Sequence, residues 1–204
     1  MDTVRKLQEI FSHFPGIGPR QARRFVHYLQ SRPNSFTKDL VKLIDELKRD
    51  THECTSCHRF FISSRETSLC SICQDSDRET KSLMIVARDS DFEAIERSGA
   101  YRGLYFILGG LIPILDKQPE KHVHLNPLME RITNDPAISE IIISLNTTPD
   151  GEHTVGVIKE YLGIAKIARP ITITVLGRGL STGAELEYAD SDTIRYALEN
   201  RKKQ

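Results

Sequence analysis

Apolar residues recur at three- and four-residue spacing near the start of the chain. Two such runs precede residue 30: Val4, Leu7, Ile10, Phe11 and Phe14, then Ala22, Phe25, Val26 and Leu29. This spacing places the apolar side chains on one face of a helix. The run Pro15–Pro19 separates the two helices, and Pro19 suits the first turn of the second. The pattern predicts a helix-hairpin-helix.

A third helical run follows, and a polar region comes after it. Leu40, Leu43, Ile44 and Leu47 share one face, with Thr37 expected as the N-cap of this helix. The polar stretch from Gln74 to Ser82 reads as a linker.

From Leu83 onward, short continuous apolar runs alternate with helical stretches. The runs lie at 83–87, 104–108, 141–143 and 171–176. Three helices are expected between them: one capped by Asp89 or Asp91 and ended by Gly99, one opened by Asn126 and Pro127, and one from His153 to Leu162. Continuous β-branched strands that alternate with helices predict an α/β domain with a mostly parallel sheet, covered on both faces.

Composition sets limits on the partners of the chain. Among 204 residues, 28 Lys and Arg balance 28 Asp and Glu, so no overall field attracts nucleic acid. The N-terminus lacks the apolar run of a secretory signal, and the apolar stretch from Tyr105 to Leu115 is too short to span a bilayer. We expect a cytoplasmic protein that does not bind membranes.

All four cysteines occur as two C-x2-C pairs, Cys54 with Cys57 and Cys70 with Cys73. Each pair can direct two thiolates at one tetrahedral metal ion, and four thiolates leave no position for water or substrate. The alternative is a redox pair, but redox C-x-x-C motifs lie near a βαβ unit, whereas these pairs follow a helix in a polar stretch. His58 is a competing ligand, although four cysteines already complete the shell. The spacing therefore predicts one structural Zn2+ per chain.

The helix-hairpin-helix carries an excess of positive charge. Gly16 and Gly18 permit a tight turn and close approach of a partner, and the amides at the start of the second helix suit a phosphate. Arg20, Arg23 and Arg24 follow directly. An ordinary helical hairpin whose glycines only close the turn is the alternative. The arginines favour binding to the DNA backbone without regard to sequence.

Two loops in the second half carry candidate chemistry. Asp150 and Glu152 follow the third predicted strand, and in an extended segment they would point to the same side and hold a hard cation. The alternative is a polar turn in which Gly151 supplies a positive φ. The stretch Gly177–Gly183 hints at a dinucleotide loop, but no further strand follows it, so the required βαβ context is missing.

The order of these features resembles the RecR family of bacterial recombination mediators. The resemblance covers nearly the whole chain and rests on five features: Phe14–Pro19, the two C-x2-C pairs, Ala94–Gly99 with Tyr101–Tyr105, Asn146–Glu152, and Gly183–Tyr188. It implies a Toprim domain in the α/β half and a homo-oligomer, either a dimer or a tetrameric ring large enough to encircle duplex DNA. Members of the RecR family act with RecO, and in some bacteria RecF, to load RecA onto single strands coated with SSB.

The chain also departs from that pattern. Toprim enzymes have a Glu at the end of the first strand, where this chain has Ala87, and Val175 stands where an arginine is common in the family. Asp150 and Glu152 match the acidic positions of the later loop. Loss of the Glu removes the group that would act as general acid or base, or help to hold Mg2+. We therefore expect a domain retained for binding.

The sequence gives one preferred function and two alternatives. The expected regions are 1–52 for DNA binding, 53–75 for the zinc finger, 82–176 for the Toprim-like domain and 177–204 for packing or oligomerisation. The preferred function is a non-catalytic DNA-binding recombination mediator. The first alternative is a Toprim-type, Mg2+-dependent enzyme that nicks or rejoins DNA, and the second is a zinc-stabilised adaptor that binds only protein.

Overall fold

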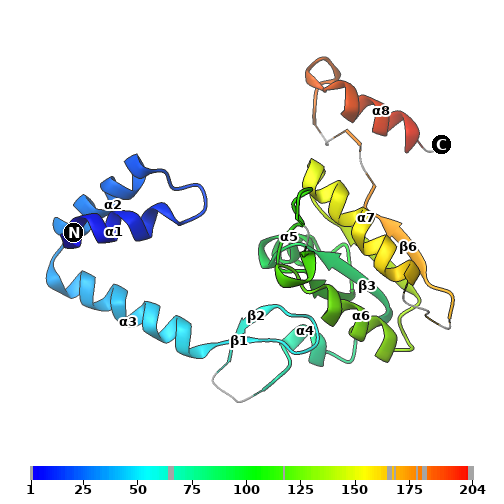
Figure 1. Cartoon of the computed structure of the whole chain (residues 1–204), viewed down its shortest axis with the longest axis horizontal. Helices are drawn as coiled ribbons and strands as arrows, with labels where there is room; N and C mark the ends of the chain where they lie inside the picture. Colours follow the sequence, from blue (N-terminus) through cyan, green and yellow to red (C-terminus); the bar gives the residue numbers. More distant parts are fainter. Residues whose placement is uncertain are drawn as a thin grey trace. The chain divides into compact units, whose positions relative to one another are not determined.

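The computed structural model describes residues 2–63, 67–116, 118–164, 167, 169–177, 179–180 and 183–201. They form two compact units, whose elements are shown in Figure 1. The first unit holds residues 2–51 with 62–63. The second holds residues 52–61 with the described residues from 67 onward.

The first unit begins with two helices that lie side by side, α1 (Thr3–Ser12) and α2 (Pro19–Gln30) (Figure 1). Their contact is aromatic and apolar. The ring of Phe11 lies edge-on to those of Phe14 and Phe25, with centroids 5.7 and 5.9 Å away, and Ala22 and Val26 of α2 are buried. The predicted helical pair is confirmed, although α1 ends at Ser12 and Phe14 lies in the turn.

The third helix, α3 (Asn34–Asp50), begins one turn earlier than the sequence predicts. Its N-cap is Pro33, so the expectation that Thr37 caps it is wrong. The extra turn is held by Phe36, whose ring lies edge-on to Tyr28 with the centroids 6.0 Å apart. On the rest of α3, four apolar side chains stay more than half exposed: Val41, Leu43, Ile44 and Leu47.

A four-stranded parallel sheet forms the centre of the second unit. Its strands are β3 (Glu79–Val86), β4 (Gly103–Ile107), β5 (Glu140–Ser144) and β6 (Thr172–Val175), in the order β4-β3-β5-β6. All three pairings are parallel, which confirms the predicted sheet. The linker expected from Gln74 to Ser82 is wrong in its second half, because β3 starts at Glu79. The first three residues of β3 are exposed and polar, so no apolar run in the sequence marks them as part of a strand.

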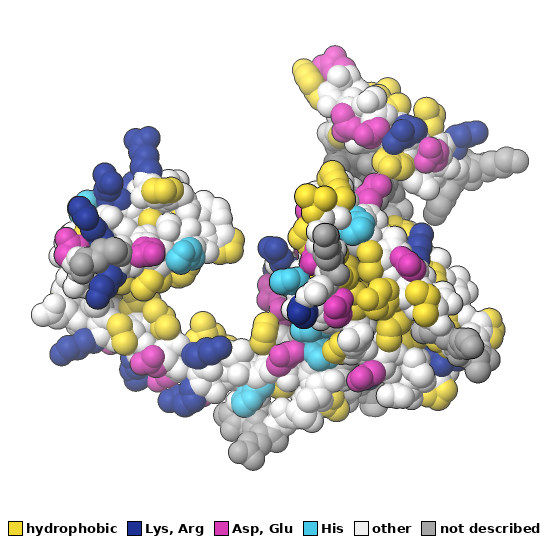
Figure 2. All heavy atoms as spheres, viewed as in Figure 1, with side chains coloured by type: hydrophobic (Ala, Val, Ile, Leu, Met, Phe, Trp, Pro, Cys, Tyr) yellow, Lys and Arg dark blue, Asp and Glu magenta, His cyan; other side chains and the backbone are white. Residues whose placement is uncertain are grey.

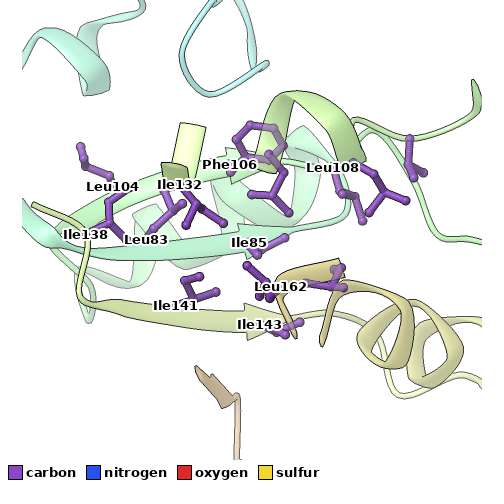
Figure 3. Packing of buried hydrophobic residues seen from close by; sticks show 14 of the residues in the cluster. Leu83, Ile85, Leu104, Phe106, Leu108, Ile132, Ile138, Ile141, Ile143 and Leu162 are labelled. Atoms are coloured by element: carbon purple, nitrogen blue, oxygen red, sulfur yellow. The ribbon is translucent and has the colours of Figure 1, made fainter. Parts of the chain in front are cut away.

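Helices cover both faces of this sheet, as predicted. Alternate side chains of a strand point to opposite faces. One face packs against α6 (Leu125–Asn134) and α7 (Pro149–Ile164) in the cluster of Figure 3, which includes Leu83, Ile85, Leu104, Phe106, Ile132, Ile141, Ile143 and Leu162. On the other face, Met84, Val86, Tyr105 and Ile107 pack with Phe92 of α5 (Asp89–Ser98).

The ends of α5 follow the sequence only in part. Gly99 ends the helix with a φ of 65°, as expected of a glycine at this position. The N-cap is Arg88, so neither Asp89 nor Asp91 is the cap. Asp91 instead acts from inside the first turn, where its carboxylate accepts a hydrogen bond from the backbone N–H of Arg88 at 3.0 Å.

Shorter elements complete the chain: η1 (Pro119–Lys121), η2 (Leu186–Tyr188) and α8 (Ser191–Glu199), whose N-cap Asp190 accepts from the backbone N–H of Thr193 at 2.9 Å. The candidate dinucleotide loop Gly177–Gly183 lies partly outside the described residues, at Arg178, Ser181 and Thr182. Within the described ranges, no helix is long and apolar enough to cross a membrane.

Candidate functional site

Four cysteine sulfurs converge beside the short strands β1 (Thr51–Glu53) and β2 (Phe60–Ile62) and the helix α4 (Ser71–Gln74). The sulfurs of Cys54, Cys57, Cys70 and Cys73 all lie within 4.8 Å of one another, and that of Cys57 is 3.6 Å from that of Cys70. A tetrahedral zinc ion with 2.3 Å bonds needs sulfurs about 3.8 Å apart. The first three cysteines are buried and the fourth is partly so. The geometry and the donors suit a closed structural site.

Backbone hydrogen bonds shape each C-x2-C pair into a turn. The N–H of His58 donates to the carbonyl of Cys54 at 2.9 Å, and that of Gln74 donates to the carbonyl of Cys70 at 3.1 Å. The N–H of Cys70 also donates to the sulfur of Cys54 at 3.4 Å. These turns bring thiols that are close in sequence to one point in space.

The four thiols perturb one another's ionisation. All four cysteines are free of disulfides. The pKa of Cys54 is lowered because the thiol of Cys57 hydrogen-bonds to it, and the pKa of Cys57 is raised by the same contact. Neighbouring thiolates repel one another, so all four lose their protons together only when a cation compensates the charge.

The cysteine module is fixed to the sheet of the second unit. The carbonyl of Cys57 accepts from the N–H of Ile107 at 2.8 Å, and the N–H of Phe60 donates to the carboxylate of Asp89 at 3.1 Å. The guanidinium of Arg59 lies 4.4 Å from the ring centroid of Phe92. Burial raises the pKa of the Asp89 carboxyl group. These contacts join the module to the end of β4 and to α5.

The start of α2 is open to a partner. Gly16 has a φ of 75°, which favours glycine, and Gly18 is the extended N-cap before Pro19. In the described part of the chain, no side chain caps this end, and a Cβ placed at either glycine would meet no atom within 4 Å. The backbone amides of the first turn are therefore accessible, and such amides attract anions.

Three arginines surround this open helix end. Arg20, Arg23 and Arg24 are exposed, and they share one side of α2 because residues three and four apart are neighbours on a helix. Among the described residues, none of the three forms an ion pair. Figure 2 shows Lys and Arg side chains gathered over α1, α2 and α3. The neutral chain thus has one distinctly basic unit.

The residue that directly follows β3 is not acidic. Ala87 follows the strand directly, is 2% exposed, and accepts a hydrogen bond from the N–H of Gly109 at 3.0 Å. The position where Toprim enzymes have a Glu is therefore a buried alanine against a glycine loop.

The structure corrects the expected geometry of Asp150 and Glu152. Both lie in the first turn of α7 and not in an extended segment, and residues two apart on a helix diverge by about 200°. Asp150 accepts from the N–H of Ile114 at 3.3 Å. Glu152 points elsewhere and lines a cavity of about 510 Å3 with Asp190 and Asp192. The two carboxylates do not point to the same side, so that expectation is wrong.

Gly151 does not have the role that the alternative interpretation, a polar turn, gave it. Its φ is not positive; instead, a Cβ there would lie 1.9 Å from the carbonyl oxygen of Asn146. Thr154, which is buried, holds the same turn: its hydroxyl donates to the carbonyl of Asp150 at 2.6 Å and accepts from the N–H of Ile112 at 2.8 Å. Close packing of the backbone, and not an unusual φ, requires glycine at this position.

His58 is not part of the cysteine cluster. It belongs to a separate group with Glu53 and His124, whose ligand atoms lie within 4.8 Å of one another. The sequence did not reveal this group, because His124 is far from His58 along the chain and no spacing pattern links them. The presence of the two histidines, His58 and His124, is the only sign of this group in the sequence.

The parallel sheet and the helices that cover it belong to a Toprim domain. Residues 81–177 match the family described as Toprim domain, and residues 179–202 match the family described as RecR, C-terminal.

The chain belongs to the RecR family of recombination proteins. It is 32% identical to the recombination protein RecR of Lactobacillus acidophilus over 200 residues, which cover 97% of this chain and 96% of the relative. It is 35% identical to that of Dehalococcoides mccartyi over 199 residues, 98% of this chain and 93% of the relative. Membership in this family indicates a role in recombination and DNA repair.

Proposed function

We propose that this chain is a non-catalytic, DNA-binding recombination mediator. It helps to load RecA onto SSB-coated single strands together with RecO, and with RecF where that protein is present. The observation that carries the proposal is the uncapped start of α2, where Arg20, Arg23 and Arg24 stand exposed around accessible amides.

Phosphate recognition follows from that arrangement. Amides at a helix N-terminus and guanidinium groups both bind phosphate oxygens, and neither reads base identity. Gly16 and Gly18 leave open space in which a sugar-phosphate backbone can approach. Binding of this kind is independent of sequence and weakens as salt increases.

Assembly into a homo-oligomer, a dimer or a tetrameric ring, would multiply these contacts. Exposed apolar side chains on α3, Val41, Leu43, Ile44 and Leu47, support association, because a monomer rarely exposes such a stripe. Several weak hairpins on one ring bind DNA strongly through multivalency. Residues 177–204 are proposed as a further packing or oligomerisation segment.

The remaining regions support binding and not catalysis. Residues 1–52 are proposed to bind DNA, 53–75 to hold the Zn2+ that stabilises the module, and 82–176 to bind RecO. Asp150 and Glu152 are candidates for the partner contact, since both lie beyond the carboxyl end of β5, where binding residues gather in parallel sheets. Ala87 supplies no general acid or base at the position where Toprim enzymes have a Glu.

A reconstituted loading assay tests the proposal. RecA filament formation on SSB-coated single strands is followed in the presence of RecO. The wild-type chain should accelerate it, and Arg20→Glu with Arg23→Glu should abolish the acceleration without changing the oligomer size in light scattering. The matched control is Arg97→Glu with Lys159→Glu, which makes the same change in total charge at exposed positions of the second unit. Equal loading by the two double variants would remove the hairpin from the mechanism.

Two assays separate this proposal from its alternatives. If supercoiled plasmid and Mg2+ gave nicked product that Asp150→Ala abolished, the chain would be a Toprim-type enzyme. If the chain failed to bind DNA even at low salt, it would be an adaptor that binds only protein.

A further inference from the structure

Glu53, His58 and His124 form a second cluster of possible metal ligands beside the four cysteines. Each offers one ligand atom, and these atoms lie within 4.8 Å of one another. All three belong to the second unit: Glu53 ends β1, His58 follows Cys57, and His124 precedes α6.

The ring of His58 contacts three other side chains. Its Nδ1 lies 2.6 Å from a carboxylate oxygen of Glu53. Its centroid lies 5.2 Å from that of Phe106, a core residue visible in Figure 3, and 4.4 Å from that of His124. The imidazole therefore contacts Glu53 and packs against the rings of Phe106 and His124.

Hydrogen bonding fixes which nitrogen of each ring is available. The Nδ1 of His124 lies 3.1 Å from the carbonyl oxygen of Ile107, which can only accept, so this nitrogen carries the proton. The Nδ1 of His58 carries its proton for the same reason, because it faces the carboxylate of Glu53. A metal ion would then be bound through Nε2 of each ring. A carbonyl or carboxylate on the other ring nitrogen is the usual outer-shell partner of a metal-bound histidine.

The backbone at His58 is strained. Its φ of 59° is the sole positive φ of a non-glycine residue in the described part of the chain. A residue with a side chain rarely adopts this conformation, which persists where the surroundings impose it and is frequent at functional sites. Glycine would relieve the strain, but it would also remove the imidazole.

We propose that His58 and His124 bind a second divalent transition-metal ion through their Nε2 atoms, with Glu53 orienting His58. Two imidazoles favour Zn2+, Ni2+ or Cu2+ over hard cations such as Mg2+. His58 also lines a cavity of about 540 Å3 with Thr55, Ser56 and Glu130, and none of the three residues of the cluster is fully buried. This site differs from the cysteine site in its donor atoms and in being open.

Calorimetric titration with Ni2+ tests the proposal on the full chain, without a polyhistidine tag and with the cysteine site already loaded with zinc. We expect one Ni2+ per chain. His124→Ala should abolish this binding, and Glu53→Gln should weaken it ten- to a hundredfold, as loss of an outer-shell partner does. His122→Ala is the matched control, because His122 lies two residues before His124 and its side chain is 65% exposed. This variant should bind Ni2+ as the wild type does.

Two further measurements keep the test independent of folding. Elemental analysis before the titration should find one zinc per chain in every variant, which shows that the cysteine site is intact. His58→Gly should lose Ni2+ binding while the chain stays folded, because glycine accepts the positive φ without strain. Ni2+ binding that persisted in His58→Gly or His124→Ala, or no binding by the wild type, would overturn the proposal.

Discussion

Removal of the metal from the cysteine site should unfold the module and leave the sheet folded. The module has little regular structure and little buried apolar core of its own. Strands β1 and β2 have three residues each, and the apolar side chains packed against the cysteines, Phe61, Leu69 and Ile72, are only partly buried. An isolated two-stranded hairpin is marginally stable at best.

A comparison of free energies shows why the module should unfold without its metal ion. Binding of a structural zinc ion contributes on the order of 10 kcal/mol at neutral pH. The hydrogen bonds that join the module to the sheet and its helices, among them those from Ile107 to Cys57 and from Phe60 to Asp89, contribute about 1 kcal/mol each. They cannot offset the loss of the ion. The sheet has its own apolar cluster, so it does not need the module.

Hydrogen exchange followed by mass spectrometry measures this directly. After chelation, the amides of His58 and Gln74 should exchange as in an unfolded peptide, while those of Ile85 and Ile143 stay protected. Cys70→Ser should give the same result without chelator, and Ser68→Ala, at an exposed position in the same loop, should not. Unchanged protection of the His58 and Gln74 amides after complete removal of zinc would refute the reasoning.

Two experiments test the packing of the second unit. Gly151→Ala should destabilise it by about 3 kcal/mol, because the added Cβ would lie 1.9 Å from a carbonyl oxygen, whereas Gly156→Ala, in open space on the same helix, should stabilise it by about 0.5–1 kcal/mol in urea unfolding. Glu96→Gln should cost about 2 kcal/mol at neutral pH, since the guanidinium of Arg78, 3.1 Å away, lowers the pKa of Glu96. That stabilisation is present above the unfolded-state pKa near 4.3 and is lost as the pH falls through the lower folded-state pKa, so wild type and variant should converge in acid.

Each of these predictions has a result that would contradict it. Equal stability of the two glycine variants would show that the turn before α7 has room to relax. A difference between wild type and Glu96→Gln that grew in acid would have the wrong sign for a carboxylate with a lowered pKa. Glu93→Gln, at an exposed position of the same helix, is the control for the second experiment and should change stability by less than about 0.5 kcal/mol.

The sequence predicted those elements whose signal is local. Continuous apolar runs gave β3, β4 and β5, because strands buried on both faces cannot alternate with polar residues. Helical spacing gave α1 and α2. The C-x2-C spacing gave the convergence of the cysteines, since each pair already makes a turn that points two sulfurs the same way.

The errors come from contacts that the local pattern does not contain. Helix α3 begins before Thr37 because Phe36 packs on Tyr28 of α2. The sequence places Glu152 in a loop, because Pro149 and Gly151 are typical turn residues. In the structure Pro149 begins α7, and Gly151 is required because the backbone of Asn146 approaches it closely.

The cluster of Glu53, His58 and His124 could not be predicted for a similar reason. Its members come from separate elements that are brought together when the cysteine module docks on the end of β4. The basic surface on α2 was predicted by residue type, because three arginines on one helical turn need no tertiary contact to define a charge.

Duplex binding measured against salt concentration tests the central claim most directly. The logarithm of the binding constant should fall by about 0.9 per phosphate contact for each tenfold rise in salt. Arg20→Glu with Arg23→Glu should flatten that slope by about 2 for each subunit that engages DNA, while Arg97→Glu with Lys159→Glu keeps the wild-type slope. The same slope and affinity in wild type and in the Arg20, Arg23 variant would contradict the proposal that the start of α2 binds the DNA backbone.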